Sequence, residues 1–217
     1  MIKVQFGCGL SNPAGWRNFD STPTLFARKI PFAPAIAGVF IKITGNKKKR
    51  LSLILGNVIN SKAEYGDIVK GLPLETASVD VLYGSHVLEH LPVKEFRIAL
   101  EECKRILRDD GILRVVVPNL RFYVDEYLES SSPTKSIDFS LDTGMGSESF
   151  ANPLSRMRGD SHHVMYDAET MLNELRSVGF SKVRQAYFGD SECAEFSEVE
   201  DQSRWSYPSC IGFECSK

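Results

Sequence analysis

Short apolar runs bounded by turn residues recur along the chain and predict the strands of a sheet. The first four are IKVQF at 2–6, WRNFD at 16–20, SVDVLYGS at 78–85 and GILRVVVP at 111–118. The three consecutive valines of the fourth run are typical of a strand that is covered on both faces. Two final strands are predicted by SKVRQAYFG at 181–189 and SCIGFECSK at 209–217.

Apolar positions at helical spacing predict two helices between these strands. In LPVKEFRIALEECKRILRDDG, at 91–111, Gly111 is the expected end and the apolar positions are Phe96, Leu100, Cys103, Ile106 and Leu107. A strand, this helix and a second buried strand form a right-handed βαβ unit of a parallel sheet. In DAETMLNELRSVGF, at 167–180, Asp167 is the expected cap and Gly179 the expected end.

The region after Pro118 is expected to leave the sheet. NLRFYVDEYLES, at 119–130, has the pattern of a helix, whereas residues 130–153 are rich in Ser, Gly and Pro and predict a loop. A chain of 217 residues with 42% hydrophobic composition suits one domain with a sizeable core. We therefore expect a single domain over 1–217, with insertions at about 23–62 and 130–160.

Composition narrows the class of protein. A net charge of −2 and a pI near 6.1 argue against a dedicated nucleic-acid binder, which carries a basic footprint. Five cysteines, an odd number without a CxxC pair, favour free thiols in a reducing cytoplasm. No signal-peptide pattern opens the chain, and the longest apolar stretch, at 30–45, is too short to span a bilayer. The expectation is a soluble cytoplasmic α/β protein.

Gly7 and Gly9 flank Cys8 directly after the first predicted strand and indicate a ligand-binding turn. Ligands of open α/β sheets bind beyond the carboxyl ends of strands, and glycine allows the backbone to approach a ligand closely. Asp20 ends the next strand, where a carboxylate can accept hydrogen bonds from ribose hydroxyls. Only residues 10–15 separate the turn from WRNFD, too few for the helix of a normal parallel crossover. On this pattern alone, a plain strand–turn–strand remains an alternative.

Four segments taken together resemble S-adenosylmethionine-dependent methyltransferases of the Rossmann-like class. They are GCG at 7–9, GWRNFD at 15–20, YGDIVKGLPLETASVDVLYGSHVLEHL at 65–91 and ECKRILRDDGILRVVVPN at 102–119. The similarity is strongest to short predicted methyltransferases whose glycine motif runs directly into GW…N.D. It covers residues 1–128, and HHVMYDAETMLNELRSVGF at 162–180 matches the usual ending of that fold. The resemblance implies a mostly parallel seven-stranded sheet with an antiparallel C-terminal strand, and S-adenosylmethionine as cofactor.

The same resemblance implies roles for the residues at the strand ends. The backbone amides of Gly7 and Gly9 would lie against the methionine end of the cofactor. Asp20 would hold the ribose hydroxyls. Asp67 would accept a hydrogen bond from the adenine amino group, and the backbone of Ile68 would contact the edge of the ring.

Four further positions belong to the expected cofactor site. Ser85 and His86 would line it near the sulfonium, and Cys8 belongs to the turn as a small buried residue rather than a nucleophile. Gln5 stands where the family commonly has an acidic residue, so neutral amides or water would recognise the cofactor's amino group. The missing first helix also removes a helix N-terminus from the cofactor's carboxylate.

The histidines of the sequence suggest two further functional hypotheses. HVLEH at 86–90 spells H-x-x-E-H, in which His86 and His90 would bind zinc and Glu89 would act as base, so a zinc hydrolase is a remote alternative. Pro92 leaves barely one turn of helix to support such ligands. His163 is a candidate for orienting or deprotonating a substrate hydroxyl. A surface or capping histidine is the alternative for His163.

Methyl transfer is an in-line displacement, in which the protein mainly aligns the nucleophile and excludes water. No Asp/Asn-Pro-Pro-aromatic motif follows the strand at 78–85, so an oxygen on a small molecule or sugar-type substrate is the expected acceptor. A non-catalytic cofactor-binding or partner-binding domain is the alternative. A nicotinamide oxidoreductase is disfavoured, because its fingerprint needs glycine where Asn12 stands.

The insertion ARKIPFAPAIAGVFIKITGNKKKR, at 27–50, joins an apolar stretch to the basic run Lys47–Arg50. It could form a lid over the substrate, or contact an anionic membrane surface weakly through residues 30–50. A plain helical excursion with solvated lysines is the third reading. Nothing in the sequence indicates the oligomeric state.

Overall fold

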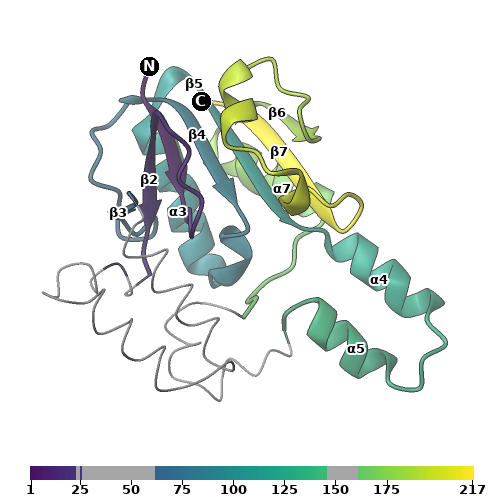
Figure 1. Ribbon diagram of the computed structural model, residues 1–217. Coiled ribbons are helices and arrows are strands. Elements are labelled where there is room, and N and C mark those ends of the chain that lie inside the picture. The colour runs from purple at the N-terminus through teal and green to yellow at the C-terminus, as the bar shows by residue number, and fades with distance from the viewer. Residues whose placement is uncertain (23–24, 26–61, 146–160) are drawn as a thin grey trace, which may run out of the picture.

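The computed structural model of the protein (Figure 1) describes residues 1–22, 25, 62–145 and 161–217. A seven-stranded sheet in the order β3-β2-β1-β4-β5-β7-β6 forms its centre. The strands are β1 (Lys3–Phe6), β2 (Trp16–Asp20), β3 (Glu64–Tyr65), β4 (Val79–Ser85), β5 (Leu107–Pro118), β6 (Ser181–Ala186) and β7 (Cys210–Ser216). β7 is antiparallel to both of its neighbours and the other pairs are parallel, which confirms the predicted Rossmann-like α/β fold.

Each of the three helices predicted from the sequence corresponds to a helix of the structure. The α-helices of the described residues are α3 (Val93–Ile106), α4 (Leu120–Glu129), α5 (Lys135–Asp142) and α7 (Ala168–Val178). Short 3₁₀ helices among the described residues are η3 (Leu88–His90), η5 (Ala194–Glu198) and η6 (Gln202–Arg204). As predicted, Asp167 caps α7 by accepting a hydrogen bond from the Thr170 N–H, and Gly179 ends it at φ 90°. Within the described parts of the chain, no helix is long and apolar enough to cross a membrane.

The predicted end of the first helix at Gly111 is wrong. α3 ends at Ile106, and Leu107 already belongs to β5, where it pairs with Val79. The register between β4 and β5 then shifts, because Ile112 pairs with Val81. A Cβ on Gly111 would lie 2.9 Å from the Val79 carbonyl oxygen. The glycine therefore allows close approach of two strands at this irregularity and does not cap the helix.

The loop predicted after Ser130 is also wrong in part, because α5 lies within it. Asp138 in the first turn of α5 accepts hydrogen bonds from the hydroxyls of Ser132 and Thr134, which orders the approach to the helix. α4 and α5 form a hairpin that projects from the body of the molecule (Figure 1). β3 is the strand that was not predicted from the sequence. It has only two residues, Glu64 and Tyr65, and both are exposed.

The two faces of the sheet are covered in different ways. α3 and α7 cover one face, where apolar residues of β1, β4, β5 and β7 form the larger core (Figure 1). The other face is covered by the segment between β6 and β7, whose Phe196, Val199 and Trp205 pack on Tyr83 and Val116. Residues 7–15 join β1 to parallel β2 without a helix. The β6–β7 segment thus occupies a face that crossover helices normally cover.

A buried ion-pair network attaches this segment to the sheet. Arg114 on β5 is fully buried and pairs with Glu200 and Asp190 of the segment and with Glu214 of β7. Its guanidinium carbon also lies 4.6 Å from the centre of the Trp205 ring. Because a buried guanidinium without acidic partners is strongly destabilising, this network fixes the segment against β5.

We expect Arg114→Met to lower the free energy of unfolding by about 3–5 kcal/mol, because it leaves three carboxylates without their buried cation. Arg184→Met is the matched control. Arg184 pairs with Asp190 and Glu214 as well, but its side chain is 39% exposed, so we expect a loss of about 1 kcal/mol or less. Urea unfolding followed by circular dichroism measures both. Equal losses would contradict the role given to Arg114.

Candidate functional site

A pocket of about 450 Å³ lies at the carboxyl ends of the adjacent strands β1 and β4. It is lined by the glycine turn, the two strand ends and the β6–β7 segment, through Gln5, Gly7, Cys8, Leu10, Ser11, Tyr83, Ser85, Val199, Asp201 and Arg204. This volume is in the range of small-molecule sites. The structure therefore brings four of the predicted cofactor residues together, namely Gln5, Gly7, Cys8 and Ser85.

Gln5 lines this pocket and has an acceptor atom without a partner among the described residues. Its side chain lies on β1 opposite Tyr83 and the residue is 4% exposed. The Oε1 atom has no hydrogen-bond partner among the described residues. A buried amide oxygen without a donor is costly, and a donor on a bound molecule would remove that cost.

The two glycines of the turn have different surroundings. Both have positive φ, 59° at Gly7 and 55° at Gly9. A Cβ on Gly7 would lie 2.1 Å from Val87 Cγ2, so this glycine is required by packing. A Cβ on Gly9 would meet no atom of the described residues within 4 Å, so this glycine borders open space in that part of the chain. The turn is thus packed on one side and open on the other.

Asp20 holds the turn in place. It is 7% exposed, and its Oδ2 accepts a hydrogen bond of 2.8 Å from the Gly9 N–H. Its Oδ1 accepts one of 2.7 Å from the Thr22 N–H. The Gly9 amide, expected to face a ligand, is therefore bonded to Asp20. A carboxylate has about four acceptor positions, so Asp20 retains capacity for hydroxyl donors.

Asp67 and Ile68 lie beyond β3, outside the lining of the described pocket. Asp67 accepts a hydrogen bond from the Val69 N–H and forms an ion pair of 2.8 Å with Lys70. Ile68 belongs to the larger core and is 6% exposed. The carboxylate of Asp67 thus orders its own turn.

Arg204, Asp201 and Val199 also line the pocket and were not predicted from the sequence. The guanidinium of Arg204 donates hydrogen bonds to the carbonyl of Ser85 at 2.8 Å and to its hydroxyl at 3.2 Å. The next residue, Trp205, donates to the Tyr83 hydroxyl. These contacts join residues more than a hundred positions apart, which spacing alone cannot reveal. The available signal was a cation beside an aromatic residue in an otherwise acidic segment.

His86 follows β4 in a left-handed conformation, with φ 54°. Its Nε2 lies 3.0 Å from the carbonyl oxygen of Arg204, and its Nδ1 lies 3.2 Å from Glu89 Oε1. Burial opposes protonation of His86, but its contacts with Cys210, Glu89 and that carbonyl outweigh burial and raise its pKa to about 10. The imidazole therefore connects Glu89 to the pocket segment as a cation.

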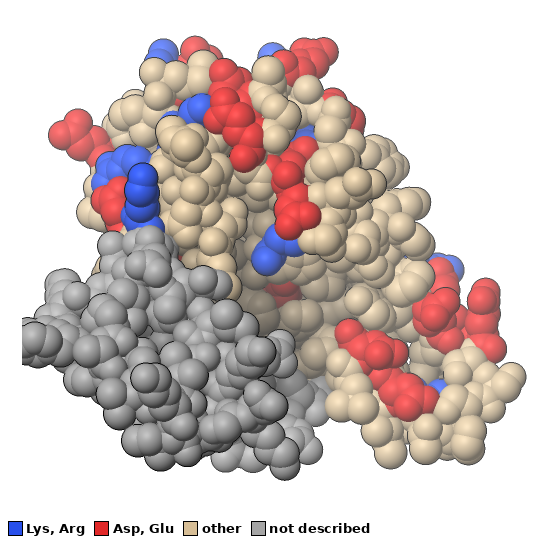
Figure 2. Space-filling model, in the orientation of Figure 1, with Lys and Arg blue, Asp and Glu red and all other residues tan. Residues whose placement is uncertain are grey.

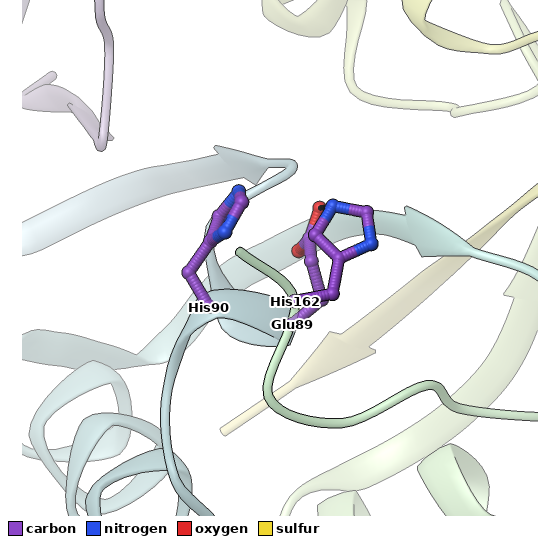
Figure 3. A group of neighbouring side chains, drawn as sticks. All are labelled: Glu89, His90 and His162. Carbon is purple, nitrogen blue, oxygen red and sulfur yellow. Dashed lines mark ion pairs between the residues drawn. The ribbon is translucent and has the colours of Figure 1, made fainter. Parts of the chain in front are cut away.

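Of the other histidines in the predicted motifs, two contact each other and one is exposed. His90 and His162 lie together, with ring centres 4.8 Å apart, and Glu89 lies beside them (Figure 3). His163 is exposed, and its backbone N–H donates to the Glu89 carbonyl. The structure thus brings His162 to the end of β4 where the sequence favoured His163. It also groups Glu89 with His90 and His162, whereas the H-x-x-E-H reading required His86 as a ligand.

Cys8 is a buried thiol, as expected. It is 4% exposed, and burial together with the charge of Asp20 raises its pKa to about 12. The thiol is therefore neutral near pH 7 and is a poor nucleophile. All five cysteines are free.

Several expectations concern parts of the chain outside the described residues. They are the lid or membrane contact at 30–50, the basic run at 47–50 and most of the two insertions. On the described surface in Figure 2, acidic side chains gather over the loops beside β6 and β7, and basic ones are scattered among them. This face of the described structure has no basic stripe of the kind that follows a nucleic-acid backbone.

A family model described as a methyltransferase domain matches residues 41–115. That range contains β3, β4, α3 and the first part of β5, and it leaves the glycine turn outside. No curated protein matches the chain. The glycine-turn assignments therefore rest on the structure and on the resemblance of the motifs.

Several solved structures with a similar fold are described as methyltransferases. One is an S-adenosylmethionine-dependent methyltransferase from Archaeoglobus fulgidus, with 14% identity, a TM-score of 0.50, and coverage of 100% of this chain and 86% of that one. Another, from Thermotoga maritima, has 17% identity, a TM-score of 0.47 and coverage of 100% and 82%. A third, PigF with S-adenosylhomocysteine, has 14% identity, a TM-score of 0.47 and coverage of 100% and 50%.

At these identities the structural likeness establishes the fold, and the family model adds the methyltransferase domain over about a third of the chain. The chain therefore matches a methyltransferase-domain model over residues 41–115 and has a fold similar to that of methyltransferases of known structure.

Proposed function

We propose that the pocket between β1, β4 and the β6–β7 segment binds S-adenosylmethionine, and that the protein transfers its methyl group to a small molecule. The observation that carries this proposal is the pocket at the carboxyl ends of β1 and β4, where the lining residue Gln5 has a buried Oε1 without a partner among the described residues. The ammonium group of the methionine moiety is the kind of donor that Gln5 lacks. A neutral amide can accept that hydrogen bond where the family commonly has a carboxylate.

Asp20 is the residue we propose for the ribose hydroxyls. Its two oxygens already accept hydrogen bonds from Gly9 and Thr22, so its position is fixed before a ligand arrives. The open space at Gly9 supports a ligand on that side of the turn. The backbone of Asp67 and Ile68 follows β3, the next strand beyond Asp20, and we retain these two residues for the adenine ring.

Arg204 is the residue we propose for the cofactor's carboxylate. The short 7–15 connection supplies no helix N-terminus to this end of the pocket. Arg204 lines the pocket as a fixed cation, because its guanidinium is held on Ser85. An arginine pairs well with a carboxylate through parallel hydrogen bonds.

The bound cofactor would supply a methyl group activated by the sulfonium. The residues of the chain would orient the cofactor, keep water away and leave the acceptor facing it at the end of β4. We propose an oxygen acceptor on a small molecule or sugar-type substrate, and retain His163 as a candidate for orienting or deprotonating it. The five free thiols support a reducing cytoplasm as the compartment.

Calorimetric titration with S-adenosylmethionine tests the pocket. We expect micromolar binding by the wild-type protein, and binding at least tenfold weaker for Asp20→Asn, because one charged acceptor is lost. For Gln5→Met we expect weaker binding with no loss of thermal stability, since Gln5 Oε1 has no protein partner among the described residues. A folded wild-type protein that binds neither S-adenosylmethionine nor S-adenosylhomocysteine would rule out the proposed function.

A pair of ligands tests Arg204 separately. S-adenosylhomocysteine carries the amino acid carboxylate, and 5′-methylthioadenosine lacks it. We expect Arg204→Gln to weaken binding of the first about tenfold, or about 1.4 kcal/mol, and to change binding of the second less than about twofold. The control is Arg121→Gln, because Arg121 is a 76% exposed residue of α4 paired with Asp125. Equal losses for both ligands would show that Arg204 supports the pocket without contacting the carboxylate.

A further inference from the structure

Three side chains with metal-binding atoms converge beside the end of β4. Glu89 and His90 belong to η3, and His162 comes from the segment that leads to α7 (Figure 3). One ligand atom from each lies within 4.8 Å of the other two, and His162 Nε2 lies 4.0 Å from Glu89 Oε1. The chain brings these residues together across more than seventy positions.

Both imidazole rings are held with the same nitrogen available. His90 Nδ1 lies 3.1 Å from the Ser161 carbonyl oxygen, and His162 Nδ1 lies 2.6 Å from that of Thr143. Because a carbonyl oxygen can only accept, each Nδ1 must carry a proton, so in the neutral imidazole the lone pair is on Nε2. Metal-binding histidines characteristically have this arrangement, since a hydrogen bond from the second nitrogen fixes the tautomer and the ring orientation.

The carboxylate of Glu89 also has acceptor capacity that the described residues do not use. The residue is fully buried, and neither carboxylate oxygen accepts a hydrogen bond of good geometry from the described residues. His86 Nδ1 approaches Oε1 at 3.2 Å and offers partial compensation on one side. The His86 cation therefore compensates part of the charge of Glu89, and the remaining lone pairs of this buried carboxylate are left for a metal ion.

We propose that Nε2 of His90, Nε2 of His162 and the carboxylate of Glu89 bind a first-row divalent cation such as Zn²⁺. Two imidazoles and one carboxylate suit zinc better than Mg²⁺ or Ca²⁺, which prefer oxygen ligands. Tetrahedral ligands on bonds of about 2.0–2.1 Å lie about 3.3 Å apart. The 4.0 Å separation of His162 from Glu89 requires side-chain shifts of under about 1 Å to reach that spacing.

Three protein ligands leave a coordination position open. A chain of contacts connects the cation site to the pocket, since His86 joins Glu89 to the Arg204 carbonyl and Arg204 holds Ser85. An oxygen of the methyl acceptor, from a hydroxyl or a carboxylate, is the ligand class that we infer for the open position. This role rests on the proposed function, whereas the cation site depends only on its three side chains.

The test is titration of chelator-treated full-length protein with Zn²⁺ alone, by calorimetry and by metal content after gel filtration. We expect one equivalent, bound in the micromolar range or tighter. Each of His90→Gln and His162→Gln should weaken binding at least tenfold, with circular dichroism verifying the fold. His163→Gln is the matched control and should bind as the wild type does, because that neighbouring side chain is exposed.

The absorption spectrum of the protein with Co²⁺ in place of Zn²⁺ tests the ligand set without any variant. We expect d–d absorption without the near-ultraviolet thiolate band that a cysteine ligand would produce. A folded protein that binds no zinc overturns the proposal. So does zinc that persists in both histidine variants and disappears in Cys210→Ser, since Cys210 Sγ lies 3.7 Å from His86 Nε2 and would then be the ligand.

The two proposals fail in distinguishable ways, because each titration uses one ligand. Zinc bound by a protein that does not bind S-adenosylmethionine leaves the cation site standing and removes the proposed function. Cofactor binding by a protein that binds no zinc has the opposite meaning.

Discussion

The buried guanidinium of Arg114 is the interaction on which the candidate pocket depends. It lies inside the sheet with acidic partners from β7 and from the segment before it, and aromatic rings pack over it. A cation in this position is tolerated only while those carboxylates are present, so the segment has one energetically acceptable position. Val199, Asp201 and Arg204 reach the pocket because of that position.

This arrangement compensates for the short connection between β1 and β2. Nine residues, 7–15, cannot hold a crossover helix, so one face of the sheet needs another cover and the pocket lacks a helix N-terminus. The β6–β7 segment supplies both substitutes. Its Phe196 and Trp205 bury the face, and its Arg204 supplies positive charge at the strand ends. Cover and charge thus come from the C-terminal part of the chain.

The sequence was sufficient for features that local pattern determines. Alternating and continuous apolar runs predicted six of the seven strands, and Asp167 and Gly179 predicted the limits of α7. It failed where local pattern and tertiary pairing disagree, as at Gly111, whose close approach to Val79 has no local signature. In the site, Gly7 and Cys8 could be predicted because they follow a strand, whereas Gln5 and Ser85 were predicted through the resemblance to methyltransferases. Arg204 could not, because only the folded β6–β7 segment brings it to Ser85.

Two charged residues of the described chain, Arg114 and Glu89, are completely buried. They differ in how well their charges are compensated by neighbouring groups. Arg114 has a carboxylate or carbonyl acceptor for each nitrogen of its guanidinium, which is the condition for a stable buried ion. Glu89 has the contact from His86 and no well-formed hydrogen bond within the described structure. Selection for stability alone would replace such a carboxylate with an apolar or amide side chain. Its position beside two imidazoles gives a physical reason for a carboxylate there, because a metal cation would use the lone pairs that the contact with His86 leaves without a partner.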